Sequence, residues 1–345
     1  MAVRYTLLHS SNGATAELPT AAAINYAGGI NVPSGPIDEF ILVFNGTKNA
    51  AGDILGDFSN SISNLRLTLN GDQFFTFQAG YSTPATDQAG NLGYLLNSMG
   101  PGRSVSQVPL AAAAGTVSYF ARVPCGRQAP NSTGRLEYSL SYSALAATMV
   151  NTTGAQFQIW GRYNDNYQTT VTVGQATTVN SAIATQQVVM TLPSGVPGTL
   201  AGFMIMDDRA TDADLTSIQV ISQSDYQMTT AYWRMINGDM NNGVLYANET
   251  ISAAALVGGA AGVAVSSNNL QVVQFVPGCF FIPTYGLTLA SDVRILCTFA
   301  AARAFQFLPI ITAPAGSRTM GGQRQTQAVK SNVAQAVLDA SDSLV

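Results

Sequence analysis

The stretch Leu65-Arg66-Leu67-Thr68-Leu69-Asn70-Gly71-Asp72 alternates apolar and polar residues and then reaches an Asn-Gly pair. Such alternation is typical of a half-buried β-strand, and Asn-Gly directly after it indicates a hairpin turn. Comparable short runs at 40–44, 117–123 and 136–142 are bounded by Gly, Pro, Asn and Asp residues. Helical periodicity is confined to the C-terminal tail and to a stretch near Ala253. The sequence therefore predicts an all-β protein.

A series of strand-like stretches occurs twice in the same order and at similar spacing. Residues 40–44, 65–72, 120–124 and 155–159 match residues 203–206, 218–225, 280–283 and 303–307, and the strand from Leu136 matches the one from Val293. Pro124 and Pro283 are expected to end the same strand in each half. A long-period repeat of this kind indicates a duplicated domain. We therefore predict two tandem eight-stranded jelly-roll β-barrels followed by a C-terminal helix.

The predicted boundaries divide the chain into an N-terminal arm (1–35), a first jelly roll (36–165), a second jelly roll (166–315) and a C-terminal arm or helix (316–345). The last segment carries a narrow apolar stripe at helical spacing, formed by Val329, Val333, Val337 and Leu344. A single helix of this length is marginal in water, so it should dock on another surface. It either folds back on its own barrel or serves as an assembly arm that binds a partner.

The composition suggests a surface that other protein covers. The chain has 345 residues, of which 47% are hydrophobic and only 10% are charged, with a formal net charge of −4. A protein that stays separate in solution normally carries more surface charge, so this balance suits a chain packed against its own copies. There is no basic stripe with interleaved aromatic residues, and we therefore expect no sequence-specific binding of nucleic acid.

The N-terminal residues do not resemble a signal peptide, which leads us to expect that the protein stays in the cytosol until it assembles. The weakly polar stretch 251–265 is too short and too rich in glycine to cross a bilayer.

Few residues offer catalytic chemistry. His9 is the one histidine, so a Ser-His-Asp or Cys-His arrangement has a single candidate base, which lies in the predicted arm. Cys125, Cys279 and Cys297 show no ligand spacing and are expected to be buried or free, with a Cys279–Cys297 disulfide left open. No phosphate-binding loop is present. We expect no catalytic residue and no cofactor.

One acidic cluster is a weak candidate for a metal site. It consists of Asp207, Asp208, Asp212 and Asp214. Carboxylates of this kind can bind Ca²⁺, but the stretch lacks the glycine and the terminal glutamate of an EF-hand loop. The favoured interpretation is a solvated loop between two strands.

The pattern as a whole resembles the double jelly-roll major capsid proteins of the adenovirus-like lineage of tailless, icosahedral viruses, which includes bacteriophages. The segments that carry the likeness are 36–43, 64–71 and 122–124 in the first half, and 214–220 and 280–283 in the second. The resemblance implies a structural protein that is no enzyme and forms homotrimers of pseudo-hexameric outline, which tile an icosahedral shell. It implies assembly in the host cytoplasm and residence in the virion. The implied partners are neighbouring capsomers, penton and minor capsid proteins and, through the terminal arms, an internal membrane.

Three other classes share parts of the pattern. A spike or tail protein built from β-sandwiches has the same composition, although duplication favours a shell tile. A carbohydrate-binding or carbohydrate-cleaving β-sandwich needs a cleft with aromatic platforms and paired acids, for which only the Asp207–Asp214 region offers candidates. An outer-membrane β-barrel is expected to show a signal peptide and evenly spaced strands.

Overall fold

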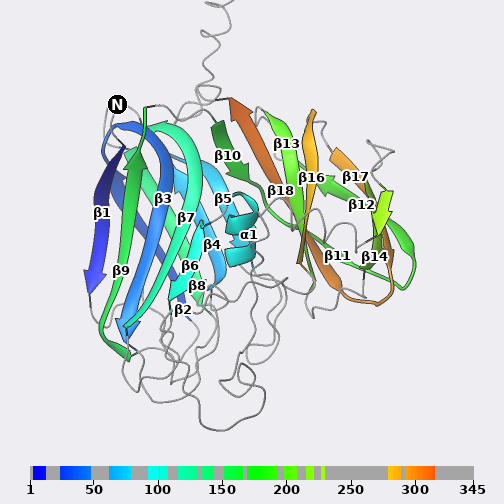
Figure 1. The fold of residues 1–345 in the computed structure, drawn as a ribbon, viewed down its shortest axis with the longest axis horizontal. Coiled ribbons are helices and arrows are strands. Elements are labelled where there is room, and N and C mark those ends of the chain that lie inside the picture. Colours follow the sequence, from blue (N-terminus) through cyan, green and yellow to red (C-terminus); the bar gives the residue numbers. More distant parts are fainter. Residues whose placement is uncertain are drawn as a thin grey trace, which may run out of the picture.

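The computed structural model describes residues 3–12, 24–47, 62–78, 92–100, 102–107, 116–129, 134–142, 151–165, 169–192, 198–207, 215–220, 227–229, 279–288 and 292–314. Within these ranges the chain forms antiparallel sheets and one short helix, α1 (Leu92–Ser98). The strands fall into two groups that lie side by side (Figure 1). The prediction of an all-β protein with two tandem jelly rolls is confirmed.

The first jelly roll consists of two facing sheets. Its strands are β1 (Arg4–Asn12), β2 (Ile24–Val32), β3 (Gly35–Thr47), β4 (Ile62–Leu69), β5 (Asp72–Gln78), β6 (Ser104–Gln107), β7 (Thr116–Ala129), β8 (Gly134–Tyr142) and β9 (Asn151–Tyr163). One sheet has the order β1-β9-β3-β7-β6, and the other has the order β2-β8-β4-β5. Alternate residues of each strand point between the sheets, as the burial of Leu65, Leu67 and Leu69 around exposed Arg66 illustrates.

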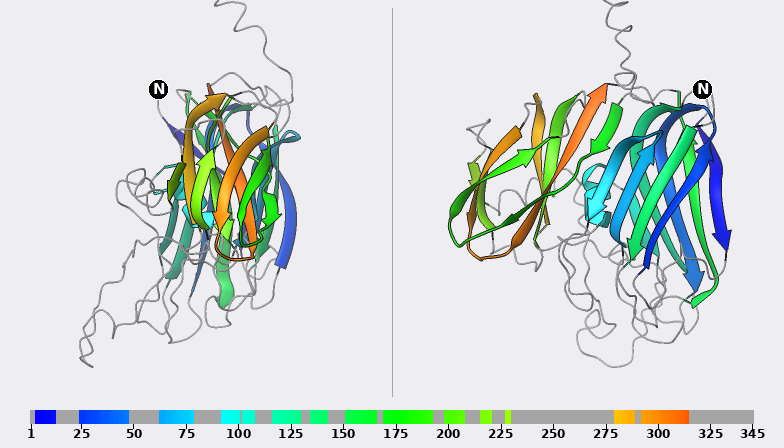
Figure 2. Two further views of the ribbon diagram at one scale, coloured as in Figure 1. Left: turned by 90° about the vertical axis from the view of Figure 1, so that its right-hand side faces the viewer. Right: turned by 180° about the vertical axis from the view of Figure 1, so that it is seen from behind.

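The second jelly roll repeats this arrangement. Its strands are β10 (Thr169–Val173), β11 (Thr177–Asn180), β12 (Thr185–Thr191), β13 (Thr199–Asp207), β14 (Leu215–Val220), β15 (Gln227–Thr229), β16 (Cys279–Thr288), β17 (Asp292–Phe299) and β18 (Ala304–Pro314). Its sheets have the orders β10-β18-β13-β16 and β12-β17-β14-β15, and β11 also pairs with β18. Seen from behind, the two jelly rolls again lie side by side (Figure 2).

The two halves share one topology. Each stretch that the sequence repeat paired lies in an equivalent strand: β3 and β13, β4 and β14, β7 and β16, β8 and β17, β9 and β18. A local irregularity is also repeated. Asp38 is an extra residue in β3 relative to its neighbour β9, and Ala201 is an extra residue in β13 relative to β18. A shared bulge at one position supports a common origin for the halves, because bulges are specific features of a fold.

Pro124 and Pro283 do not end strands, and that part of the prediction was wrong. Pro124 lies inside β7 opposite Glu39, and Pro283 lies inside β16 opposite Gly202, in each case next to the bulge of the partner strand. Proline has no N–H to donate, so it fits a strand only where the ladder is already interrupted. The proline and the bulge therefore form one conserved unit of the two halves.

The predicted N-terminal arm over residues 1–35 was also wrong for its described part, because β1 and β2 belong to the first jelly roll. His9 lies in β1, with its ring about 6.1 Å from those of Tyr138 and Phe157. In β2, Gly28 lies beneath the Tyr138 ring, where a Cβ would come within 2.6 Å of the ring. Glycine weakens a strand, and this glycine is accommodated because the tyrosine of β8 covers it. The C-terminal arm (316–345) and the stretch near Ala253 lie outside the described residues.

Two cysteines are buried in the sheets. Cys125 and Cys297 are free thiols with no exposed surface, so the structure contains no Cys279–Cys297 disulfide. Burial raises the pKa of each of these two thiols to about 12. Both therefore remain protonated, and hence poor nucleophiles, at ordinary pH.

This burial predicts that Cys125 and Cys297 do not react with iodoacetamide at pH 8 in the folded protein but react fully in urea. Peptide mapping by mass spectrometry measures the labelling of each cysteine separately. Rapid labelling of Cys125 under native conditions would contradict the packing of β7 described above.

Candidate functional site: the junction between the two jelly rolls

The residues that the sequence suggested as sites fall mostly outside the described chain. Asp207 is the last residue of β13, whereas Asp208, Asp212 and Asp214 lie outside the described residues, as do Val329, Val333, Val337 and Leu344. In the part of the chain that the structure describes, no group of three or more His, Cys, Asp or Glu side chains could hold a metal ion. No helix among these residues is long and apolar enough to cross a membrane.

The most extensive structural feature is instead the apolar junction between the jelly rolls. The outer face of the second jelly roll's β10-β18-β13-β16 sheet packs into the same hydrophobic cluster as the core of the first. The buried residues that it contributes are Val173, Met204, Met206, Phe281, Leu308 and Ile310. Full burial of one such side chain stabilises a structure by about 1.5–3 kcal/mol. The first jelly roll is therefore closed on one side by the second, and the two form one packed unit.

Helix α1 lies in this junction, between the strands of the two jelly rolls (Figure 1). It begins at Leu92 in the connection between β5 and β7, and Leu92, Leu95 and Leu96 are fully buried in the shared cluster. The sequence analysis found helical periodicity only in the C-terminal tail and near Ala253, so it did not predict this helix. The spacing of these three leucines was the signal for a helix, but seven residues are too few for a clear helical period.

Arg127 connects the two jelly rolls through polar contacts. Its side chain is fully buried, and its Nε lies 3.1 Å from Asp72 Oδ2 of the first jelly roll. Its Nη1 donates hydrogen bonds to the carbonyl oxygens of Cys125 (3.0 Å) and Val171 (2.8 Å). Its Nη2 donates to Thr172 Oγ1 at 2.9 Å. Because Val171 and Thr172 belong to β10, one guanidinium group binds both halves of the molecule.

The ring of Phe74 completes the surroundings of Arg127. The guanidinium carbon lies 4.9 Å from the ring centroid, within the range of a cation–π contact. A buried charge is tolerated only when it is paired and hydrogen-bonded on all sides, and Arg127 satisfies this condition with groups from three strands.

Gly126, next to Arg127, allows the two backbones to approach closely. Its φ is +62°, and a Cβ at this position would lie 2.1 Å from the carbonyl oxygen of Thr169 and 2.8 Å from Thr170 Cα. Only glycine satisfies both the positive φ and the lack of space. The sequence analysis singled out neither Gly126 nor Arg127, since nothing local marks a residue whose partners come from another domain.

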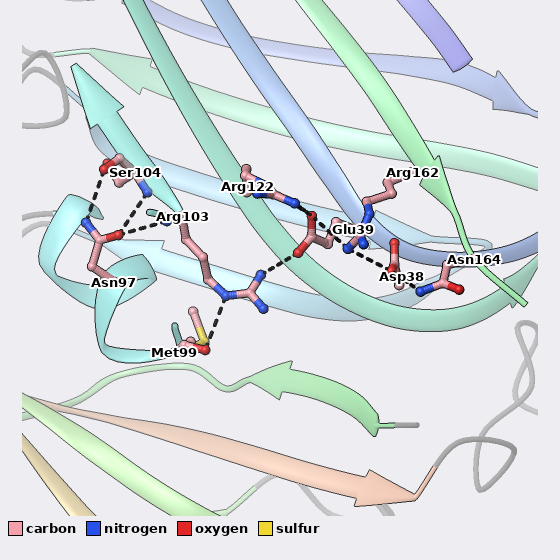
Figure 3. A network of polar contacts seen from close by, with 9 residues as sticks. All are labelled: Asp38, Glu39, Asn97, Met99, Arg103, Ser104, Arg122, Arg162 and Asn164. Atoms are coloured by element: carbon pink, nitrogen blue, oxygen red, sulfur yellow. Dashed lines mark hydrogen bonds and ion pairs between the residues drawn. The ribbon is translucent and has the colours of Figure 1, made fainter. Parts of the chain in front are cut away.

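A second polar cluster lies on the outer face of the β1-β9-β3-β7 sheet, around Glu39 (Figure 3). The Glu39 carboxylate is almost fully buried and receives Arg103 Nη1 at 2.9 Å and Arg122 Nη2 at 2.7 Å. Arg162 Nη1 lies 3.0 Å from the neighbouring Asp38 carboxylate and 3.6 Å from that of Glu39. Three cations thus surround two anions at the bulge of β3.

Asn97, at the end of α1, holds Arg103 toward this cluster. Its side-chain oxygen accepts hydrogen bonds from the backbone N–H groups of Arg103 (2.9 Å) and Ser104 (3.0 Å). Arg103 Nε in turn donates to the carbonyl oxygen of Met99 at 3.2 Å. The helix in the junction is therefore connected to the charged face of the first sheet.

At Asp38 and Arg103, burial shifts the pKa more than the neighbouring opposite charges do. Burial raises the pKa of the Asp38 carboxyl, although the hydrogen bond from Asn164 and the charge of Arg162 oppose the shift. Burial likewise lowers the pKa of the Arg103 guanidinium, against the influence of Glu39. A carboxyl whose pKa is raised by folding opposes folding once it is ionised. The cluster is therefore partly desolvated without being fully compensated.

An open depression of about 590 Å³ lies on the outer face of the first jelly roll's other sheet. Its lining includes Arg66, Arg135 and Glu137, and the last two form an ion pair at 3.4 Å while each remains more than half exposed. Exposed pairs of this kind contribute little binding or folding energy.

Comparison with known proteins adds evidence at the level of the fold. No family model and no curated protein sequence matches the chain. The Sulfolobus Turreted Icosahedral Virus structure matches over 90% of each chain, with a TM-score of 0.57 and 10% sequence identity. The chain shares the double jelly-roll fold of the matched chain in this virus structure. Other similar structures are the major capsid protein P2 of bacteriophage PM2 (TM-score 0.49, 12% identity, 91% of this chain and 98% of that one) and the PBCV-1 virus capsid (TM-score 0.49, 8% identity, 90% and 93%).

Gly126 yields a direct test of the close approach at the junction. Gly126→Ala should lower the free energy of unfolding by about 3 kcal/mol or more, because the new methyl group meets backbone that cannot move aside. Gly71→Ala is the matched control, since Gly71 also has a positive φ (+80°) but no atom within 4 Å of the added Cβ. Its free energy of unfolding should fall by only about 1 kcal/mol, the cost of placing a Cβ on a backbone with positive φ. Urea denaturation followed by circular dichroism measures both values, and equal losses would contradict the close approach.

The contribution of Arg127 to stability can be tested by comparing its substitution with that of an exposed arginine in the same jelly roll. Arg127→Met should lower the free energy of unfolding by about 3–5 kcal/mol, because it breaks a buried ion pair and three hydrogen bonds, two of which cross the junction. Arg135→Met, at a side chain with 64% exposure, should change it by less than about 1 kcal/mol. The same denaturation experiment compares them. A small loss for Arg127→Met would mean that the apolar contacts alone hold the junction.

Proposed function

We propose that the chain is the major capsid protein of an icosahedral virus. The observation that carries this proposal is the junction. Two jelly rolls with equivalent strand orders are packed side by side into one unit by a shared apolar cluster and by the buried Arg127. A duplicated domain held in this way presents similar sides at regular angular steps, which is what a subunit needs in order to tile a surface.

The proposed assembly is a homotrimer. Three copies contribute six jelly rolls, so a particle with three-fold symmetry has a pseudo-hexameric outline and fills a six-coordinated position in a shell. Closed rings form when a heterologous interface repeats with a rotation that closes. The low content of charged residues, 10% of the chain, suits a molecule whose sides are covered by neighbours.

The role is structural and needs no catalytic residue or cofactor. The proposed partners are neighbouring capsomers, penton and minor capsid proteins, in a virion that assembles in the host cytoplasm. We propose that residues 316–345 act as the assembly arm, through the stripe of Val329, Val333, Val337 and Leu344, toward such a partner or toward an internal membrane. The fold of the Sulfolobus virus structure supports the shell role, and the weakly charged composition supports the extensive contacts.

The experiment that tests this function is the mass of the purified protein by multi-angle light scattering, together with negative-stain microscopy. The proposal predicts a particle of three times the chain mass with a hexagonal outline, or closed shells. A monomer that persists at high protein concentration would contradict it and would favour the carbohydrate-binding alternative. Elongated fibrous trimers would favour a spike or tail protein.

A further inference from the structure

The depression on the outer face of the β2-β8-β4-β5 sheet has a floor of small residues. Two rows of paired residues cross it, namely Ala27, Ser139 and Arg66 in one row and Gly29, Glu137 and Thr68 in the other. Residues that pair directly in antiparallel strands have their side chains on the same face of the sheet. The small members of each row therefore leave the floor low, and the charged members border it.

Gly29, in this floor, is not required by the fold. Its φ does not lie in the left-handed region, so other residues can adopt the same backbone conformation. The atoms nearest to an added Cβ belong to the guanidinium of Arg135, at 2.7 Å, which is the flexible end of a side chain that is 64% exposed. Glycine inside a strand weakens it and often marks a place where a ligand or another backbone approaches closely. The atoms nearest to Gly29 belong to a side chain that can move aside, so packing alone does not explain this glycine.

The second jelly roll fills the equivalent floor with larger side chains. The equivalent pairs, with the first jelly roll named first, are Ala27 and Gln187, Ser139 and Leu296, Arg66 and Gln219, Gly29 and Val189, Glu137 and Arg294. Three small residues are replaced by larger ones, the arginine by a neutral residue and the glutamate by a cation. The low floor and its charges therefore belong to the first jelly roll and are not demanded by the shared topology.

The charges of the depression favour a ligand with one acidic group. Arg135 and Glu137 form the 3.4 Å ion pair, whereas exposed Arg66 has no ion-pair partner among the described residues. The guanidinium group offers N–H donors in a planar fork that matches a carboxylate. The Glu137 carboxylate can only accept hydrogen bonds, while the hydroxyl groups of Thr68 and Ser139 both donate and accept. A complementary ligand thus combines one acid for Arg66 with hydroxyl groups that donate to Glu137.

We propose that this depression binds an acidic sugar, whose carboxylate pairs with Arg66 and whose hydroxyl groups bond with Glu137, Thr68 and Ser139. The volume of about 590 Å³ lies in the range of small-molecule sites and exceeds what a simple anion fills. Tyr138, the one aromatic residue of the lining, is 3% exposed, so the ligand meets mainly polar groups and glycine backbone. The site lies within one chain and does not depend on the proposed trimer.

The test measures the binding of D-glucuronate, D-glucose and inorganic phosphate to the wild-type protein by isothermal titration calorimetry at low salt. Glucuronate carries a carboxylate where glucose carries a hydroxymethyl group, so this pair isolates the role of the acid. We expect a Kd of about 1 mM for glucuronate. Glucose and phosphate should bind about 10-fold more weakly or less, because each lacks half of the complementary groups. Equal binding of glucose or phosphate, or no glucuronate binding at about twenty times the expected Kd, overturns the inference.

Two substitutions introduce residues of the second jelly roll into the site. Arg66→Gln should weaken glucuronate binding about 10-fold or more, to the level of glucose, because the acid loses its charged partner. Gly29→Val should weaken the binding of both sugars, because the branched side chain fills the floor. The control is Arg294→Gln, which removes the same charge from an exposed position of the second jelly roll and should bind within about two-fold of the wild type.

Circular dichroism verifies that each of these variants folds. Wild-type affinity for glucuronate in folded Arg66→Gln or Gly29→Val protein contradicts the assigned site. Neither outcome bears on the proposed shell function, which the mass of the particle tests. A wild-type protein that binds glucuronate as a trimer supports both proposals, and one that binds it as a persistent monomer supports this site alone.

Discussion

The placement of the two jelly rolls depends on one buried cation. Arg127 has no access to water, so its charge must be satisfied by protein groups in fixed positions. Asp72 and Phe74 of the first jelly roll and the backbone and hydroxyl groups of β10 supply those contacts. A relative shift of the halves would leave the guanidinium unpaired in an apolar region. The surrounding methionine, leucine and isoleucine side chains add most of the buried area, but such contacts are not directional. The arginine therefore gives the junction its geometry.

The duplication left the chain with two equivalent outer sheet faces, and the junction covers only one of them. The halves share their strand order, a bulge in the equivalent strand and a proline opposite that bulge, but the two outer faces have diverged. One carries Met204, Leu308 and Phe281 and is covered within the chain. The other carries Ile41, Trp160 and Arg122 together with the charged bulge at Glu39 and is uncovered. The duplicated faces of one chain therefore differ both in chemistry and in whether the chain itself covers them.

Much of the fold could be predicted from the sequence, because strand alternation and the repeat are local signals. The matched stretches led to the correct equivalent strands, from β3 and β13 to β9 and β18. β1 and β2 were missed for a physical reason. The glycines of β2 weaken its strand signal, and Gly28 is explained only by the Tyr138 ring that covers it in the folded protein. The junction was missed because Arg127 and Val171 are 44 residues apart, and the charged cluster was missed because Glu39 and Arg122 are 83 residues apart. Such pairs are defined by topology, which a local pattern does not contain.

The central claim is that one chain forms a rigid pair of jelly rolls, the unit from which the proposed trimer is built. A cryo-electron microscopy reconstruction of the associated wild-type protein tests this most directly. The account predicts six jelly rolls around a three-fold axis, with the two jelly rolls of each chain packed through the junction at Arg127. A reconstruction without three-fold symmetry, or one in which the two jelly rolls of a chain are separated, would contradict it.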